Sequence, residues 1–235
     1  MQNILTILKK EVAGYFNSVV AYIVGILFLG VLGYFFTSPL FFENVATMRN
    51  VFQWAPMLFI IFVPAITMRT IADEKKSGTI ELLLTKPVTD MEIILGKFFG
   101  ALVMVCFILL PTLIYVITLV SIGSLDAGAL IGSYIGLLLM SAVYVAIGVW
   151  ASSVTEYQII AMLLSAVIIG FLYFLGFFLG LISHNFASVF EYISISYHFN
   201  NIARGVIDSR NIVYYLSGIL IFLLLARTSL ESRKW

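Results

Sequence analysis

Charge is what this sequence has least of. Only 11% of its 235 residues are charged, 13 Lys or Arg and 12 Asp or Glu, whereas hydrophobic residues make up 62%. Mean hydropathy is +1.09. A soluble domain carries about 25% charged residues, so this chain has too few to cover a water-facing surface. The composition therefore excludes an ordinary soluble domain and indicates an all-α, polytopic membrane protein.

Residues and motifs that carry catalysis are also scarce. Cys106 is the single cysteine, so an internal disulfide is impossible, and its apolar neighbours indicate a small buried side chain. The sequence has no G-x-x-x-x-G-K-S/T loop for ATP phosphates, no H-E-x-x-H and no G-x-S-x-G motif. We therefore expect no catalytic residue, metal site or cofactor in this chain. A net charge of +1 without a basic patch gives no reason to expect nucleic acid binding.

Histidine is limited to His184 and His198, which both fall between the last two apolar runs. A metal-handling role and an ordinary hydrogen-bonded role are both conceivable for them. Two histidines 14 residues apart with no cysteine nearby do not make a metal site. We therefore favour hydrogen-bonded histidines close to the membrane surface.

Long uncharged runs occupy most of the chain. A helix that crosses the bilayer needs about 20 mostly apolar residues. The first run is too long for the apolar part of a signal peptide, about 7–15 residues, so we expect it to be retained. No Asp, Glu, Lys or Arg lies inside the runs, which argues against a proton relay, an ion channel and an intramembrane protease. The six predicted spans are Val19–Ser38, Phe52–Met68, Phe98–Ser121, Ala129–Ala151, Ile159–Ile182 and Ile212–Ala226.

The last predicted span is short, so we expect Arg210 and Arg227 to reach the two membrane surfaces from its ends. Lys and Arg in the connecting segments then set the orientation, because they concentrate on the cytoplasmic side. Six spans put ten basic residues on the side of both termini and three on the other side. We therefore expect cytoplasmic termini. The ten are Lys9, Lys10, Arg69, Lys75, Lys76, Lys86, Lys97, Arg227, Arg233 and Lys234, and the three are Arg49, Arg204 and Arg210.

The N-terminal segment, residues 1–17, is not a span. Apolar residues recur in it at helical spacing, and polar residues fall on the other side. This pattern predicts a helix that lies in the membrane interface, with an unstructured end as the alternative. The apolar positions are Ile4, Leu8, Val12, Tyr15 and Phe16.

Proline and glycine both occur within the predicted spans. Pro56 and Pro64 lie in the second span and Pro111 in the third, where each removes a backbone donor. The sequence leaves open whether these are harmless kinks or hinges.

Glycines recur every four residues in the fourth and fifth spans, which allows close helix contact within one protomer or at a dimer seam. These glycines are Gly128, Gly132 and Gly136, followed by Gly176 and Gly180.

One segment, Arg69–Lys97, holds ten of the 25 charges. Five acids and five bases alternate in it, so it is not a polybasic lipid anchor. Ser77, Gly78 and Thr79 offer helix-start residues, and Lys86-Pro87 ends this first helix. Thr89 and Glu92 fit a capping box that starts a second helix leading into the third span. The segment is therefore predicted to be helix, turn and helix on the cytoplasmic side.

A dense apolar patch follows the first helix start. If these side chains are buried against a soluble partner at about 1.5–3 kcal/mol each, they supply several kcal/mol of docking energy. Packing on the same protein, or resting in the lipid head groups, is the equally weighted alternative. The patch consists of Ile80, Leu82, Leu83 and Leu84.

The run from Pro64 to Lys97 resembles the signature of the ABC type-2 transporter permeases, which have the type V exporter fold. Its typical form is an Arg followed by E-K-K/R-S-G-T-I/L-E-x-L-L-x-x-P, and the match here is free of gaps. The matching residues are Arg69, Glu74, Lys75, Lys76, Ser77, Gly78, Thr79, Ile80, Glu81, Leu83, Leu84 and Pro87.

The C-terminal half resembles one subgroup, the gliding-motility-associated permeases, which are close to the permease of nitrous-oxide-reductase maturation. The resemblance lies in the outer loop region and in the final residues of the chain. The matching segments are Tyr197–Phe199, Arg204–Asp208, Tyr214–Leu216 and Ser229–Trp235.

The resemblance implies a single permease domain, residues 1–235, in a bacterial cytoplasmic membrane. It implies a connecting helix at residues 1–17, a cytoplasmic coupling helix between spans two and three within residues 69–97, and an outer re-entrant hairpin at residues 185–211. It also implies an exporter in which a second copy, or a homologous permease, completes a dimer. Each half would dock on a separate ABC ATPase that binds ATP and Mg. The ATPase-coupling residues would be Glu74, Lys75, Lys76, Ser77, Gly78, Thr79, Glu81, Leu82, Leu83 and Leu84.

A second function stays open. The same docking to an ABC ATPase would also serve a non-transporting membrane anchor or mechanotransmitter that acts on an envelope accessory protein. The sequence does not indicate which cargo an exporter of this kind would move.

Overall fold

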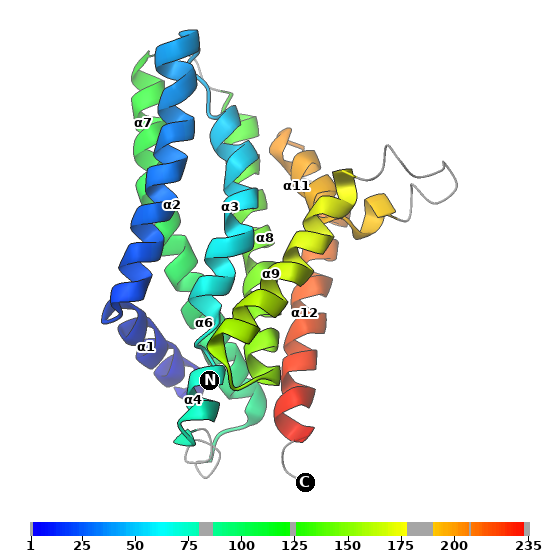
Figure 1. Ribbon diagram of the computed structural model, residues 1–235. Helices are drawn as coiled ribbons and strands as arrows, with labels where there is room; N and C mark the ends of the chain where they lie inside the picture. The colour runs from blue at the N-terminus through cyan, green and yellow to red at the C-terminus, as the bar shows by residue number, and fades with distance from the viewer. Residues whose placement is uncertain (1, 80–86, 123–125, 178–189, 207, 233–235) are drawn as a thin grey trace.

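The computed structural model describes residues 2–79, 87–122, 126–177, 190–206 and 208–232. All regular secondary structure in these residues is helical, and six helices are long and apolar enough to cross a membrane. The predicted all-α class and the number of spans are confirmed. Figure 1 shows the long helices side by side, with both ends of the chain at the end of the bundle that carries α4.

Each predicted span corresponds to a helix or to helices that follow directly on one another, except that residues 178–182 of the fifth predicted span lie outside the described residues. The spans are α2 (Val19–Ser38) with a π-helical turn (Pro39–Glu43), α3 (Arg49–Thr67), α6 (Asp90–Leu109) with α7 (Leu113–Ile122), α8 (Ala127–Val154), α9 (Gln158–Phe174) and α12 (Ser209–Glu231). The other described helices are α1 (Gln2–Phe16), α4 (Ala72–Lys76) and α11 (Ile195–Ala203).

Helix α12 is longer than its apolar run. It begins at Ser209 and ends at Glu231, so Arg210 and Arg227 both lie inside the helix. Asp208 caps its start, because the carboxylate accepts a hydrogen bond from the Arg210 backbone N–H at 2.9 Å. The apolar residues alone therefore underestimated the helix by several residues at both ends.

Helix α8 is the centre of the bundle. Nearly every residue between Met140 and Ser153 is buried, and α3, α9, α11 and α12 pack around it. Small residues permit this: a Cβ added to Gly148 would lie 2.7 Å from the Thr67 Cβ of α3. By contrast, α2 leaves Tyr22, Ile26 and other large apolar side chains exposed. Such exposure fits a helix surface that faces lipid.

The prolines of the second and third spans behave differently. Pro56 and Pro64 are buried inside α3, which stays helical through both of them. Pro111 lies in a 3-10 turn, Leu110–Thr112, that separates α6 from α7. There the Thr112 hydroxyl donates a hydrogen bond to the Leu109 carbonyl at 2.6 Å, so this carbonyl has a partner although the α-helix is interrupted next to it. Of these three prolines, Pro111 alone thus interrupts regular α-helix.

The glycines of α8 receive the short helix α11 within the same protomer. A Cβ on Gly136 would meet the Phe199 ring at 3.1 Å, and one on Gly132 would run into the Ile202 carbonyl. Gly205 follows α11 with φ of +87°, a backbone conformation that favours glycine, and its N–H bonds to the Ile202 carbonyl at 2.9 Å. The interpretation of these glycines as packing within one protomer is confirmed for Gly132 and Gly136; Gly180 lies outside the described residues.

Helix α1 is formed, as predicted for residues 1–17. It lies obliquely across the ends of α2 and α6 rather than continuing the bundle (Figure 1). Helix α11 lies toward the opposite end of the molecule from α4. The predicted re-entrant hairpin at residues 185–211 falls partly outside the described residues, and α11 is its main described part.

Candidate functional site

The charged segment begins with α4, a helix of five residues that follows α3 after a tight turn. Asp73 and Glu74 lie in its first turn and Lys75 and Lys76 in its last, an order that complements the helix dipole. Ser77 is the C-cap of α4, and Gly78 follows in the left-handed region with φ of +70°. The helix start predicted at Ser77, Gly78 and Thr79 agrees with the helical conformation of Thr79, and the predicted helix continues into residues 80–86, which lie outside the described residues.

The second predicted helix start is confirmed in detail. Thr89 caps α6, and its hydroxyl accepts the Glu92 backbone N–H at 3.3 Å. The Glu92 carboxylate in return accepts the Thr89 backbone N–H at 3.0 Å. This reciprocal pair is the capping box expected from the sequence. Asn3 of α1 also donates to this carboxylate at 3.4 Å, so the start of α6 is joined to α1.

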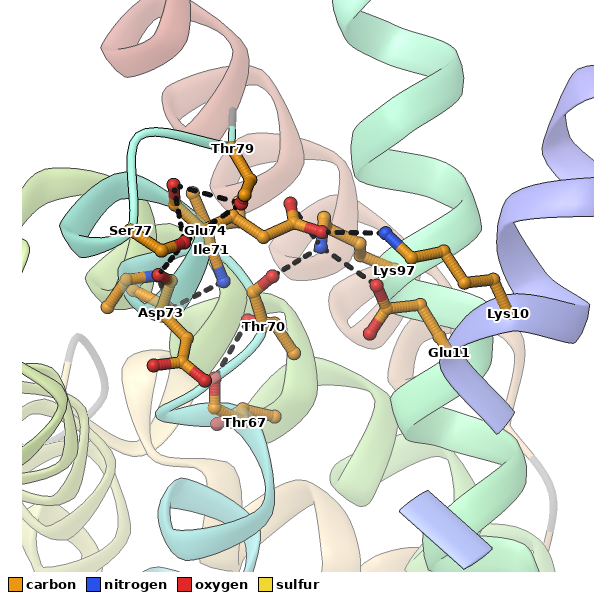
Figure 2. A network of polar contacts seen from close by, with 12 residues as sticks. Lys10, Glu11, Thr67, Thr70, Ile71, Asp73, Glu74, Ser77, Thr79 and Lys97 are labelled. Atoms are coloured by element: carbon orange, nitrogen blue, oxygen red, sulfur yellow. Dashed lines mark hydrogen bonds and ion pairs between the residues drawn. The ribbon is translucent and has the colours of Figure 1, made fainter. Parts of the chain in front are cut away.

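Eight residues into α6 lies a buried lysine. Lys97 is only 1% exposed, and its ammonium lies 2.8 Å from a Glu11 oxygen of α1 and 2.8 Å from a Glu74 oxygen of α4. It also donates to the Thr70 carbonyl, and Lys10 pairs with Glu74 at 3.1 Å. Figure 2 shows these side chains converging from separate helices. We call these five residues, Lys10, Glu11, Thr70, Glu74 and Lys97, the Lys97 cluster.

Two glycines of α6 make the Lys97 cluster possible. A Cβ on Gly96 would lie 2.7 Å from the Ile7 Cβ, and a Cβ on Gly100 would lie 2.7 Å from the Glu11 Cβ. Residues four apart share one helix face, so this smooth face lets α1 approach the α6 backbone closely. The close approach brings the Glu11 carboxylate within reach of Lys97.

The Lys97 cluster balances its charge. A buried ammonium is costly unless it is paired and hydrogen-bonded, and here two carboxylates and a carbonyl surround it. Lys10, on the exposed side, offsets the second carboxylate. A cavity of about 270 Å³ lies beside the cluster, lined by α1, α2, α3, α4 and α6 residues. The arrangement therefore joins three helices through charges rather than through apolar packing alone.

Tyr15 adds a further link from α1 to α3. Its hydroxyl donates a hydrogen bond to the Ile66 carbonyl at 3.3 Å. Burial, and secondarily the negative charge of Glu11, raise the pKa of Tyr15 above its usual value. The phenol therefore stays protonated and remains a donor to the last turn of α3.

The other side of α4 is held by α8. The Ser152 hydroxyl accepts the backbone N–H groups of Ile71 and Ala72 at 3.0 and 2.9 Å, and it donates to the Met68 carbonyl at 3.1 Å. These amides open α4 and have no partner inside the helix. Ser152, a residue of α8, thus acts as the N-cap of α4.

Two more side chains attach α4 to its surroundings on this side. Lys75 is 6% exposed and donates to the Ser153 carbonyl of α8. Gln158, the first residue of α9, donates to the Asp73 carboxylate at 2.5 Å. α4 is consequently connected to α6 and α1 on one side and to α8 and α9 on the other.

The predicted coupling residues divide into three groups. Glu74 and Lys75 are packed into contacts with other helices, whereas Lys76, Ser77, Gly78 and Thr79 are exposed at the end of α4. Glu81, Leu82, Leu83 and Leu84 lie outside the described residues. The sequence did not point to Lys10, Glu11, Lys97 or Ser152 as site residues. The one available signal was that Lys97 stands directly against an apolar run.

His198 is a hydrogen-bonded histidine, as the sequence favoured. It is 2% exposed, and its ring nitrogens lie 2.7 Å from the Asn211 side-chain oxygen and 3.0 Å from the Tyr192 carbonyl. The Tyr214 ring stacks on it with centroids 3.9 Å apart. In the part of the chain that the structure describes, no group of three or more His, Cys, Asp or Glu side chains is placed to hold a metal ion. His184 lies outside the described residues.

Six apolar helices and a polar network at one end define a class, the multi-pass helical membrane proteins. Comparison with protein-family models adds the family: residues 5–226 match the ABC-2 family transporter protein. The match spans most of the chain, which therefore belongs to the ABC-2 transporter family. Proteins of this family are membrane components of transporters and generally work with an ABC ATPase. The comparison with curated proteins finds no match.

Proposed function

We propose that this chain is the permease subunit of an ABC exporter, and that α4 with the residues following it receives movement from a separate ATPase subunit. The observation that carries the proposal is the double attachment of α4. Glu74 joins it to the buried Lys97 of α6, and Ser152 of α8 caps its first turn.

An element that transmits force must be attached firmly to what it moves. α4 satisfies this condition because its side chains and amides bond to four other helices, three of which are or include predicted spans. Its free end carries Lys76, Ser77, Gly78 and Thr79, which are exposed and precede the apolar residues Leu82–Leu84. On this proposal, the exposed end and the apolar residues contact the ATPase, and the attached end moves the bundle.

The rest of the assembly follows the resemblance to the type V exporters. A second copy of this chain, or a homologous permease, would complete a dimer, and the ATPase subunits would bind ATP and Mg. The end that carries α4 and both termini would face the cytoplasm of a bacterial cell, consistent with the excess of Lys and Arg in those segments.

Co-purification with an ATPase tests the docking. The tagged chain is purified from its native membranes in a mild detergent, and the partners are identified by mass spectrometry. We expect a P-loop ATPase in stoichiometric amount. ATP hydrolysis by the complex in proteoliposomes is then compared with hydrolysis by the isolated ATPase.

Charge reversal at α4 tests the coupling. Glu74→Arg places a cation beside Lys97 and Lys10, so we expect ATP hydrolysis in the complex to fall toward the rate of the isolated ATPase. The matched control is Glu231→Arg, at the same end of the bundle, where the carboxylate pairs with Arg227 on the surface of α12. Equal rates for wild type and Glu74→Arg, or no ATPase in the purified material, would show the proposal to be wrong.

A further inference from the structure

A large cavity lies at the end of the bundle away from α4. Its volume is about 660 Å³, and residues of α3, α8, α9 and α11 line it. Pockets that enclose small ligands typically measure about 300–1,000 Å³. The cavity is separate from the Lys97 cluster and shares no residue with it.

The inner wall of this cavity is apolar and firmly packed. Phe52, Tyr173 and Phe199 line it and are buried. Phe52 meets the Tyr134 ring edge to face, with centroids 5.2 Å apart, and Phe199 rests against Gly136 of α8. The aromatic wall is thus held in place by its own helix contacts, and it offers surface to an apolar chain.

The rim of the cavity is polar and carries a surplus of positive charge. Arg49 opens α3 and Arg204 follows α11, and both are exposed. Asp126 is the one acid in the lining, and it is already engaged as the N-cap of α8, accepting the Gly128 and Ala129 amides at 3.0 and 3.3 Å. Within the described residues, neither arginine forms an ion pair.

The placement of these arginines is selective. The charge count puts three basic residues on this side of the membrane, Arg49, Arg204 and Arg210, and two of them line this one cavity. Basic residues are disfavoured on the outer side of a bacterial membrane protein. The cavity thus has two guanidinium groups, those of Arg49 and Arg204, beside an aromatic wall. Guanidinium groups are planar donors that suit phosphate and carboxylate oxygens.

We propose that this cavity binds an amphiphile with an anionic head group, the head at Arg49 and Arg204 and the apolar chain against Phe52, Tyr173 and Phe199. The inference rests on the cavity and its charges, and it holds whether or not α4 couples to an ATPase. A lipid of the bilayer and a transported molecule share this chemistry.

Binding of two single-chain lipids to the purified chain tests the head-group preference. Lysophosphatidylglycerol is anionic and lysophosphatidylcholine is zwitterionic, and both are used with the same acyl chain in a neutral maltoside detergent. Native mass spectrometry counts the bound lipid. Both lipids offer a phosphate to the arginines, but the choline cation of lysophosphatidylcholine is repelled by them, so we expect lysophosphatidylglycerol to bind about tenfold more tightly.

Three arginine variants assign the site. Arg49→Gln and Arg204→Gln should each weaken lysophosphatidylglycerol binding about tenfold and reduce its preference over lysophosphatidylcholine. Arg210→Gln removes the same charge from α12 at the same end, and it should have no effect. Equal loss in all three variants, or no preference between the two lipids, would overturn the proposal.

A cavity-filling variant tests the apolar part. Ala203→Trp at the end of α11 adds bulk to the lining, so we expect it to abolish lysophosphatidylglycerol binding while the thermal unfolding temperature stays close to that of wild type. Inorganic phosphate at millimolar concentration should not displace the lipid. If phosphate alone competes fully, or if Ala203→Trp is folded and still binds, the cavity does not take the amphiphile.

Discussion

At the scale of single residues, Lys97 is the unusual feature of this molecule. A lysine that is 1% exposed needs surroundings that replace the hydrogen bonds of water. Glu11 and Glu74 do so at 2.8 Å each, and the Thr70 carbonyl supplies a third acceptor. Such buried ion pairs contribute little net stability compared with apolar packing. Removing one partner is nevertheless costly, because it leaves the other charge buried without a partner.

Replacing Lys97 by Met should therefore destabilise the protein strongly. The change leaves Glu11 and Glu74 without their shared partner, and removing one member of a buried ion pair costs about 3–5 kcal/mol. The measurement is unfolding of the detergent-solubilised chain by titration with a denaturing detergent. Adding Glu11→Gln and Glu74→Gln to Lys97→Met should recover much of the loss.

Lys10→Met is the control for that experiment. Its side chain is 63% exposed, and a surface pair contributes about 0–1 kcal/mol. A loss as large for Lys10→Met as for Lys97→Met would show that burial of the ammonium is not the source of the effect.

At the scale of elements, α4 is too short to be stable by itself. Isolated helices shorter than about 12–15 residues are marginal in water, and α4 has five residues. Its opening amides depend on Ser152 of α8, and its carboxylates depend on α6, α1 and α9. The helix thus exists because neighbouring helices complete it.

Removing the Ser152 hydroxyl should loosen α4. Ser152→Ala takes away the acceptor for the Ile71 and Ala72 amides, a loss comparable with an N-cap substitution, about 0.5–2 kcal/mol. Hydrogen exchange followed by mass spectrometry should show faster exchange at these two amides. In the control Ser141→Ala, the lost hydroxyl bonds to the Leu138 carbonyl of its own helix, and exchange in α4 should not change.

The contact between α1 and α6 depends on two glycines. Gly100→Ala places a methyl group 2.7 Å from the Glu11 Cβ, so α1 must move away and the ion pair between Glu11 and Lys97 lengthens. We expect faster proteolysis of the N-terminal segment in detergent. Gly96→Ala should act in the same way against Ile7.

Gly14→Ala is the matched control for these variants, because no atom lies within 4 Å of a Cβ added there. It should leave α1 in place and slow its fraying slightly, since Ala favours a helix over Gly by about 1 kcal/mol. Equal proteolysis of Gly14→Ala and Gly100→Ala would remove the steric explanation.

At the scale of the whole molecule, the single cysteine makes the orientation measurable. Cys106 is half-buried in α6, so Cys106→Ser gives a background without cysteine. Thr228→Cys near the C-terminal end and Asn44→Cys between α2 and α3 are both at exposed positions. A membrane-impermeant thiol reagent applied to intact cells should label Asn44→Cys and not Thr228→Cys. The reverse pattern would invert the expected orientation.

The six spans and one helix start could be predicted from the sequence, because they depend on residues that lie close together in the chain. Apolar runs bounded by charges marked all six membrane helices, and Thr89 with Glu92 marked the start of α6. Pro111 was a candidate break, and the 3-10 turn there makes it one. Helix ends were less accurate, since α12 continues through polar residues that the apolar count excluded.

The Lys97 cluster was not predictable in the same way. The cluster requires α1 to cross α6 at Gly96 and Gly100. The residues around Glu11 in the sequence do not indicate that its partner, Lys97, lies 86 residues away. Likewise, five residues are too few for periodicity to reveal α4, and its cap comes from another helix. Contacts between distant segments decide these features, and a pattern in one segment does not contain them.

The distance along the chain between α4 and its cap also sets an order of events during synthesis. Ser152 emerges from the ribosome about 80 residues after Ala72, and Gln158 follows it. Until α8 and the start of α9 have been made, the first turn of α4 lacks its acceptors and Asp73 lacks its donor. Helix α4 therefore becomes complete only after four of the six spans have been translated. Its completion waits for the fourth span and precedes the docking of α12.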